Sequence, residues 1–203
     1  MKDFDIVIVG AGSAGCIVTN QIINNTNLKV LLIEAGPSDN SPVIQIPLGY
    51  GMTFFHKKMN WNFYSEKQKT LNNREIYYPR GKVIGGSGSI NAMIYARGLK
   101  TDFENWNLNQ SWSWENIKDT YEKIEVPIKV KLKKIPMNKI PVNDVSNQHH
   151  SILKNFFTAA NDFHFQFNSQ LNSSIEDQVG NYNVNIINGF RASSAKIFLK
   201  PIK

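Results

Sequence analysis

A glycine-rich turn, GAGSAG at residues 10–15, lies between a short apolar run and a helical pattern. The run over residues 4–9 is rich in β-branched side chains and predicts a buried strand. Residues 14–22 place apolar side chains at helical spacing and predict a helix. A second apolar run over residues 29–34 predicts another buried strand. The order strand, glycine turn, helix, strand predicts a βαβ unit with a parallel pair of strands.

Each glycine of the turn meets a different physical demand of a dinucleotide-binding site. Gly10 permits the tight turn, Gly12 lets the backbone approach a diphosphate, and Gly15 allows close packing of helix on strand. The anion then lies at the positive end of the helix dipole. Glu34 ends the second strand, where a carboxylate accepts hydrogen bonds from ribose hydroxyls and repels a 2′-phosphate. The motif therefore predicts binding of an ADP-containing cofactor and disfavours NADP, but it leaves FAD and NAD open.

Composition and cysteine usage limit the class of protein. The chain has 203 residues, of which 41% are hydrophobic and 19% charged, as in a globular protein of one domain or of one domain and part of another. No apolar run approaches the roughly 18 residues that span a bilayer. The single cysteine, Cys16, excludes an intramolecular disulfide and a cysteine-based metal cluster. We expect a cytoplasmic protein, with peripheral attachment to a membrane left open, and no metal site.

The position of Cys16 leaves two interpretations open. It lies in the first turn of the predicted helix, where the helix dipole lowers the pKa of a thiol and makes it reactive. A small buried side chain that packs between helix and sheet fits the same position. We favour the packing role.

The formal net charge of +7 is unevenly distributed. Residues 1–128 are nearly neutral, whereas residues 129–203 carry most of the excess positive charge. Lysines alternate with apolar residues from Ile128 onward, which predicts a strand with one wetted face. No basic helix or aromatic stacking motif accompanies these lysines, so we expect no nucleic-acid partner.

A second block rich in glycine and serine covers residues 80–91 (RGKVIGGSGSIN). No strand immediately precedes it, so it does not begin a second βαβ unit. Its small residues allow the main chain to lie against a flat, extended ligand, and Asn91 offers hydrogen-bonding groups at the far end of such a ligand.

Downstream patterns predict further elements. We expect helices over residues 101–106 and 113–124, the latter capped by Ser113, and short helices that end at Ala160 and Leu199. Near residue 126 the sequence pattern changes to one typical of short strands and loops. We therefore expect an α/β protein with a Rossmann-like FAD-binding domain over residues 1–126 and the beginning of an α+β substrate domain over residues 127–203.

The sequence resembles the glucose–methanol–choline (GMC) flavin oxidoreductases, in particular their choline and alcohol dehydrogenase branch. The resemblance extends over nearly the whole chain. The matching segments are GAGSAGC at 10–16, LLIEAG at 31–36, IPLGYGMTF at 46–54, NWNFYSE at 60–66, YPRGKVIGGSGSINAMIYARG at 78–98, DFENW at 102–106 and NGFRASSAKIFLKPI at 188–202.

The resemblance implies FAD as the cofactor and oxidation of a small alcohol by hydride transfer to the flavin. Some relatives attach FAD covalently through a histidine in the second block. Ile90 stands at the corresponding position here, so we expect non-covalent FAD. The cofactor-binding residues implied by the resemblance are Gly10, Ala11, Gly12, Ser13, Ala14, Gly15, Glu34, Ala35, Val83, Gly86, Asn91, Ala92, Met93 and Ile94.

The family's catalytic histidine lies near the end of much longer chains, and none of the four histidines here matches its motif, so we name no catalytic residue. We give His56, His149, His150 and His164 ordinary surface or capping roles. We expect a truncated FAD-binding part of a GMC-type oxidoreductase. The alternatives are a non-catalytic flavin- or nucleotide-binding fragment and one subunit of a split enzyme, whose second polypeptide supplies the rest.

Overall fold

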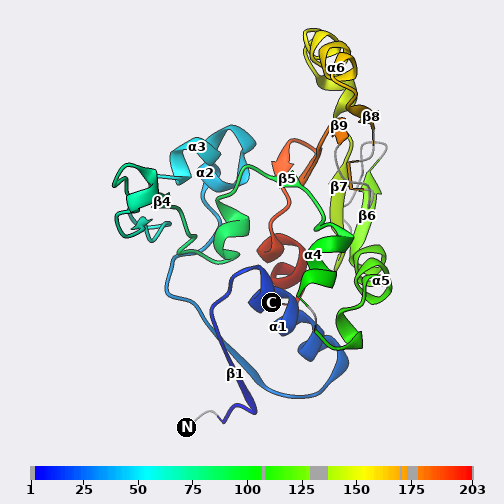
Figure 1. The fold of residues 1–203 in the computed structure, drawn as a ribbon. Helices are drawn as coiled ribbons and strands as arrows, with labels where there is room; N and C mark the ends of the chain where they lie inside the picture. The colour runs from blue at the N-terminus through cyan, green and yellow to red at the C-terminus, as the bar shows by residue number, and fades with distance from the viewer. Residues whose placement is uncertain (1–2, 107, 129–136, 170, 173–177, 203) are drawn as a thin grey trace. The chain divides into compact units, whose positions relative to one another are not determined.

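The computed structural model describes residues 3–106, 108–128, 137–169, 171–172 and 178–202 (Figure 1). Two compact units make up the chain. The first consists of residues 1–93, 135–138 and 186–203, and the second of residues 94–134 and 139–185. The chain thus leaves the first unit and returns to it at its C-terminal end.

The first unit begins with the predicted βαβ arrangement. Strand β1 (Ile6–Val9) is followed by helix α1 (Ser13–Asn25) and strand β2 (Val30–Ile33). The strands pair in parallel, with Ile6 opposite Val30 and Val9 opposite Ile33. The parallel register confirms the βαβ prediction and places the glycine turn between β1 and the first turn of α1.

The prediction that both strands are buried is wrong. Side chains of β1 alternate between half-buried and exposed, and Val7 and Val9 are 55% and 83% exposed. In the described part of the chain this sheet has only two strands, and α1 packs against it. A fully buried parallel strand needs cover on both faces, so an alternating pattern results when one face lacks it.

Short elements complete the first unit. Strands β3 and β4 pair antiparallel, as do β11 and β12. The elements are α2 (Pro42–Gln45), η1 (Pro47–Gly49), α3 (Tyr50–Thr53), β3 (Phe63–Tyr64), η2 (Lys69–Leu71), β4 (Tyr77–Tyr78), η3 (Gly86–Ser89), β11 (Ile186–Ile187), β12 (Phe190–Arg191), η6 (Ala195–Leu199) and η7 (Lys200–Ile202).

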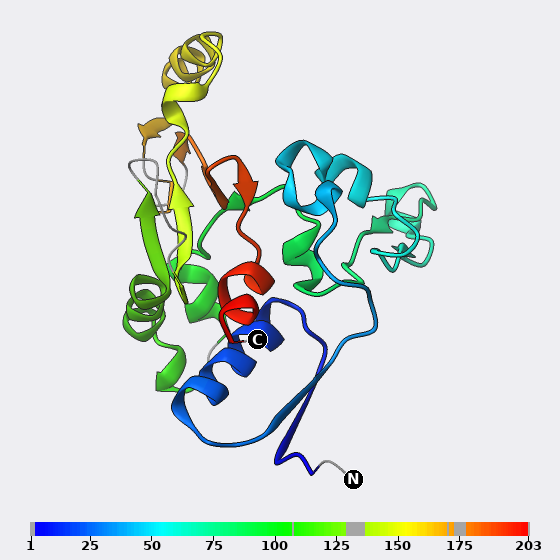
Figure 2. The ribbon, with the colours of Figure 1, turned by 180° about the vertical axis from the view of Figure 1, so that it is seen from behind.

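The C-terminal helical segment packs on α1, as Figure 2 shows. The side-chain amide of Asn20 is buried and donates to the carbonyl oxygen of Phe198 at 2.8 Å and to Oδ1 of Asn138 at 2.9 Å. The helix predicted near residues 193–199 is confirmed as the π-helical segment η6, which continues into a 3₁₀ turn. This contact ties the last residues of the chain to the helix that follows the glycine turn.

The second unit contains a four-stranded sheet in the order β5-β10-β7-β6. Strands β6 and β7 run parallel, and the other neighbours run antiparallel. The elements are β5 (Ile94–Tyr95), α4 (Lys100–Asn105), η4 (Gln110–Trp112), α5 (Trp114–Ile124), β6 (Glu125–Ile128), β7 (Ile140–Asn143), η5 (Ser146–Gln148), α6 (Leu153–Asp162), β8 (Gln166–Asn168), β9 (Gln178–Gly180) and β10 (Asn183–Val184).

Several predictions for the second unit are confirmed. Helices α4 and α5 cover the predicted ranges, and Oγ of Ser113 caps α5 by accepting a hydrogen bond from the backbone N–H of Asn116 at 3.5 Å. The lysine-rich strand predicted after Ile128 lies over residues 129–136, outside the described residues. The predicted boundary between an FAD-binding and a substrate domain at residue 126 stays a prediction. The two compact units do not meet at that residue, because each is built from separate stretches of the chain.

A half-buried charged cluster stabilises the second unit. The carboxylate of Glu125 on β6 accepts hydrogen bonds from Nε of Arg97 at 2.9 Å and from the hydroxyl of Tyr95 on β5, and it forms an ion pair with Nη2 of Arg97. The guanidinium of Arg97 also lies over the ring of Tyr121, 5.0 Å from its centroid. Burial and the neighbouring Glu125 raise the pKa of Tyr95, so its hydroxyl stays protonated and acts as a donor.

We predict that Glu125→Ala lowers the free energy of unfolding by about 2 kcal/mol, because it leaves Arg97 without its anion. The control is Glu104→Ala, since Glu104 pairs with Lys100 at 3.4 Å with both side chains about half exposed. The control changes stability by no more than about 0.5 kcal/mol. Urea unfolding measures the free energy of unfolding of both variants. Equal losses in Glu125→Ala and Glu104→Ala would contradict a stabilising role of the cluster.

Candidate functional site

The glycine turn combines a tight conformation with an open side. Gly10 has φ +94°, a conformation that residues with a Cβ rarely adopt. A Cβ on Gly15 would overlap the carbonyl oxygen of Gly10, so helix and turn meet at van der Waals distance. A Cβ on Gly12 would meet no atom of the described structure within 4 Å. The turn role of Gly10 and the packing role of Gly15 match the geometry. The space beside Gly12 is open, and its role toward a diphosphate stays a prediction.

The positive end of the α1 helix dipole faces the open space beside Gly12. Gly12 is the N-cap residue and offers no side-chain oxygen, and the first turn carries no acidic residue. The first N–H groups of a helix have no partner within the helix, so those of Ser13 and Ala14 are available to an anion. Ser13 and Ala14 are both exposed.

The second glycine block packs directly on the first. A Cβ on Gly86 would lie 2.8 Å from Cα of Gly12, and one on Gly88 would lie 2.7 Å from Oγ of Ser13. The backbone N–H of Gly85 donates to the carbonyl oxygen of Ala11 at 2.7 Å. Two segments about seventy residues apart therefore form one continuous wall beside the N-terminus of α1, a contact that the sequence analysis did not predict.

Glu34 joins the end of β2 to the glycine turn. Its Oε2 accepts from the backbone N–H of Ala11 at 2.8 Å, and its Oε1 accepts from the N–H of Gly36 at 2.9 Å. Each carboxylate oxygen retains capacity for a further hydrogen bond. The next residue, Ala35, is exposed.

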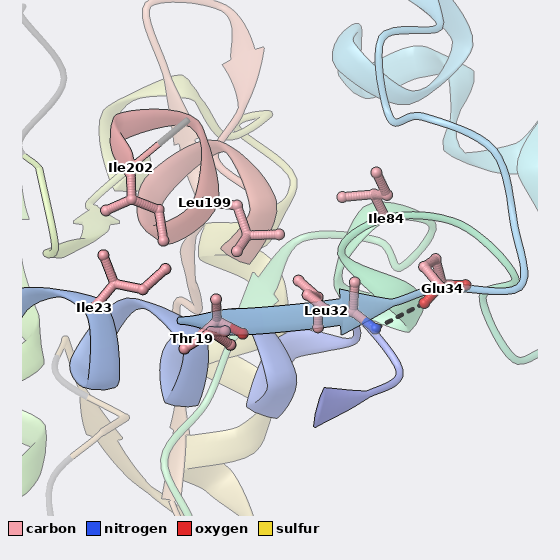
Figure 3. A pocket seen from close by; sticks show the side chains of 9 residues that line it. Thr19, Ile23, Leu32, Glu34, Ile84, Leu199 and Ile202 are labelled. Carbon is pink, nitrogen blue, oxygen red and sulfur yellow. Dashed lines mark hydrogen bonds between the residues drawn. The ribbon is translucent and has the colours of Figure 1, made fainter. Parts of the chain in front are cut away.

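A cavity of about 270 Å³ lies beside Glu34 (Figure 3). Figure 3 shows Glu34 and Ile84 at one end and Ile23 and Ile202 at the other. The lining is mostly aliphatic, with the carboxylate at one end, which suits a flat heterocycle attached to a hydroxylated sugar. The lining residues are Ala11, Thr19, Ile23, Val30, Leu32, Glu34, Ile84, Leu199 and Ile202.

The remaining predicted cofactor-binding residues lie in different surroundings. Asn91 is exposed, and its Oδ1 accepts from the backbone N–H of Met93 at 3.0 Å, which helps Met93 adopt φ +60°. Ala92 between them is half-buried. Val83 is fully buried in a cluster with Ile44 and Ile90. Met93 is also buried.

Ile94 is the one predicted cofactor-binding residue that begins the second unit. It is exposed and starts strand β5.

The packing interpretation of Cys16 is confirmed, and the reactive-thiol alternative is wrong. The side chain is fully buried, and Sγ lies 3.3 Å from the carbonyl oxygen of Ala11. Burial raises the pKa of the thiol to about 11, and this outweighs any lowering at the helix N-terminus.

Two of the four histidines cap local turns. Nδ1 of His56 accepts from the backbone N–H groups of Lys58 and Met59, each at 3.2 Å. Nδ1 of His150 accepts from the N–H of Ile152 at 3.2 Å. These contacts confirm the capping role expected for His56 and His150.

Arg191 is a site residue that the sequence analysis did not single out. It is 1% exposed, and its guanidinium reaches the second glycine block. Nε donates to the carbonyl oxygen of Ile44 at 2.9 Å, and Nη1 donates to Oδ1 of Asn91 at 2.7 Å and to the carbonyl oxygen of Gly88 at 3.3 Å. The only signal in the sequence is its place in the segment NGFRASS at 188–194, which carries no local pattern that predicts burial.

The family model for GMC oxidoreductases matches residues 4–203. The chain belongs to the GMC oxidoreductase family. It is 36% identical over 203 residues to an alcohol dehydrogenase [acceptor] of Pseudomonas putida, covering 98% of this chain and 37% of that protein. It is 30% identical over 217 residues to an oxygen-dependent choline dehydrogenase of Vibrio vulnificus, covering 100% of this chain and 37% of that protein.

Solved structures agree with this assignment. Pyridoxine 4-oxidase from Mesorbium loti superposes with a TM-score of 0.84 at 27% identity, over 97% of this chain and 39% of that one. The α/β architecture is therefore that of a GMC oxidoreductase. This GMC chain spans somewhat more than a third of the length of the relatives it matches.

The described residues contain neither a membrane-spanning helix nor a cluster of metal-binding side chains. None of the helices there combines the length and apolar character needed to span a bilayer. The same part of the chain holds no group of three or more His, Cys, Asp or Glu side chains arranged to bind a metal ion.

We predict that Cys16 resists alkylation in the folded chain. A pKa of about 11 leaves on the order of 0.1% thiolate at pH 8, against about a quarter for an ordinary exposed thiol. The rate of iodoacetamide reaction at pH 8 should be at least 100-fold lower in the native chain than in the same chain in urea. Similar rates in the two states would contradict the burial of Cys16.

Proposed function

We propose that this chain is the FAD-binding portion of an oxidoreductase that acts on an alcohol. The observation that carries this proposal is the open side of Gly12 beside an uncapped helix N-terminus, in a turn that Gly15 and Gly86 pack to contact. Gly10 also has an open Cβ position, but its φ of +94° accounts for a glycine there, whereas the backbone of Gly12 has a negative φ and requires no glycine for conformational reasons.

The residues of the turn fit the diphosphate of FAD. Gly12 provides the approach, and the first N–H groups of α1, at Ser13 and Ala14, donate to the phosphate oxygens. Gly86 closes the opposite side of the turn. The first turn of α1 has no acidic side chain that would repel the anion.

Glu34 and the cavity beside it fit the adenosine half. The carboxylate is held by the N–H groups of Ala11 and Gly36, so it is fixed in position to accept from the ribose hydroxyls. The aliphatic lining, including Leu32 and Ile84, accommodates the adenine. The negative charge of Glu34 disfavours a 2′-phosphate, which supports FAD over an NADP-type ligand.

The second block supports a non-covalent flavin. Asn91 lies two residues after η3, and its exposed side-chain amide offers hydrogen-bonding groups beside the second block. Ile90 is buried and aliphatic, so it provides no atom for a covalent bond to the flavin. When bound, FAD supplies the hydride acceptor, and this chain's residues bind and orient it.

The proposal of an alcohol substrate is based on the relatives of this chain, and that of a cytoplasmic location on its cysteine. The alcohol and choline dehydrogenases named above support oxidation of a CH–OH group. Since the chain spans 37% of their length, we propose that a second polypeptide supplies the catalytic groups and completes the active site. A single buried cysteine is compatible with a cytoplasmic location.

A non-catalytic flavin-binding module is the second candidate. The engagement of His56 and His150 in local turns favours it, because Nδ1 of each imidazole is occupied by backbone N–H groups. Alcohol-dependent reduction of a dye by the purified chain alone separates the candidates. We expect none, and steady reduction would show that the chain is a complete catalyst.

The central test is Gly12→Val. The backbone at Gly12 (φ −69°, ψ −174°) accepts a β-branched residue, and its Cβ position is open. We expect the substitution to fill the diphosphate space and weaken FAD binding at least 100-fold, while stability changes by less than about 1 kcal/mol.

Gly51→Val is the matched control, because Gly51 also has an open Cβ position but lies in α3. Flavin absorbance of the purified variants and a fluorescence titration with FAD give the readout. Full flavin occupancy in the Gly12→Val variant would show that the diphosphate lies elsewhere.

A further inference from the structure

We propose that Arg191 is a positioning residue of the diphosphate site, and that the diphosphate of bound FAD balances its buried charge. This inference rests on the proposed function. It concerns a residue from the far end of the chain that touches neither Gly12 nor the first turn of α1 in the described contacts. Its action therefore passes through the second glycine block.

The guanidinium of Arg191 is buried without an anion. Its hydrogen-bond acceptors are neutral, namely the carbonyl oxygens of Ile44 and Gly88 and the side-chain oxygen of Asn91. Nη2 is buried and has no hydrogen-bond partner among the described residues. Burial lowers the pKa of Arg191 to about 10, so the side chain is still charged at neutral pH.

Two carboxylates of the first unit, Asp39 and Glu34, contact other groups. Asp39 is buried and lies 3.8 Å from Nζ of Lys200. Glu34 accepts from backbone N–H groups. The Nζ of Lys196 donates to the backbone carbonyl oxygen of Arg191 at 3.2 Å, so this nearby side chain also supplies no anion. A buried cation with these neighbours favours an anion supplied from outside the chain.

The contacts of Arg191 lead to the wall of the diphosphate site. Nη1 holds the carbonyl oxygen of Gly88 in η3, and a Cβ on Gly88 would lie 2.7 Å from Oγ of Ser13. Gly86 in the same segment packs on Gly12. Arg191 thus fixes the segment that faces the N-terminus of α1, and its charge lies behind that segment in a poorly solvated environment, where electrostatic attraction is weakly screened.

The test is Asn91→Asp, which places a carboxylate against Arg191 with little change in shape. The new side chain keeps an oxygen that accepts from Nη1 of Arg191 and from the N–H of Met93. It neutralises the buried charge while the loop stays held. We expect binding of both ADP and FAD to weaken at least tenfold, with adenosine affinity within twofold of wild type and no loss of thermal stability.

Adenosine lacks the diphosphate, so the ratio of ADP to adenosine affinity separates charge from structure. If Arg191 has a purely structural role, the substitution changes the affinities for ADP and adenosine equally or leaves both unchanged. The control for net charge is Asn27→Asp, an exposed loop position, for which we expect unchanged affinities. Arg191→Lys keeps the charge, and we expect it to bind ADP at least tenfold more tightly than Arg191→Met.

Several outcomes would overturn the inference. They are unchanged ADP and FAD affinity in the Asn91→Asp variant, an equal loss for adenosine, or a loss confined to FAD, which would place the effect at the flavin end. If Arg191→Met does not fold, the Asn91→Asp result decides alone. A wild-type chain that binds neither ADP nor FAD would instead overturn the proposed function, and this inference with it.

Discussion

The close packing of two glycine-rich segments is the constraint on which the site depends. Gly86 lies against Gly12, and Gly15 lies against Gly10, at distances that leave no room for a Cβ. The backbone itself therefore forms both walls of the site. Because no side chain intervenes, a small change in either segment moves the N–H groups at the start of α1 relative to the opposite wall.

The local part of this arrangement could be predicted from the sequence. The apolar run before residue 10 and the helical spacing after it specify β1 and α1, since both patterns act over a few residues. Ser113 as the cap of α5 has the same origin, because an N-cap is satisfied by the backbone three residues later. The contact of the second block with a ligand was inferred in the same way from its small residues, and it stays a prediction.

The rest depended on contacts between distant residues, which no local pattern reports. The exposure of Val7 and Val9 reflects how many strands flank β1 and which of its faces is covered, not the residues of β1. Burial of Cys16 depends on what packs around the start of α1. Arg191 reaches its three partners across 100 or more residues. A charged side chain is normally expected at the surface, so its burial had no sequence signal.

Titration of the wild-type chain with FAD, ADP and FMN tests the central claim most directly, because FMN lacks the ADP half of FAD. If the glycine walls hold a diphosphate and Glu34 the ribose, FAD and ADP bind in competition with each other, and FMN binds at least 100-fold more weakly than FAD. FMN binding as tight as that of FAD, or no binding of FAD, would contradict the account.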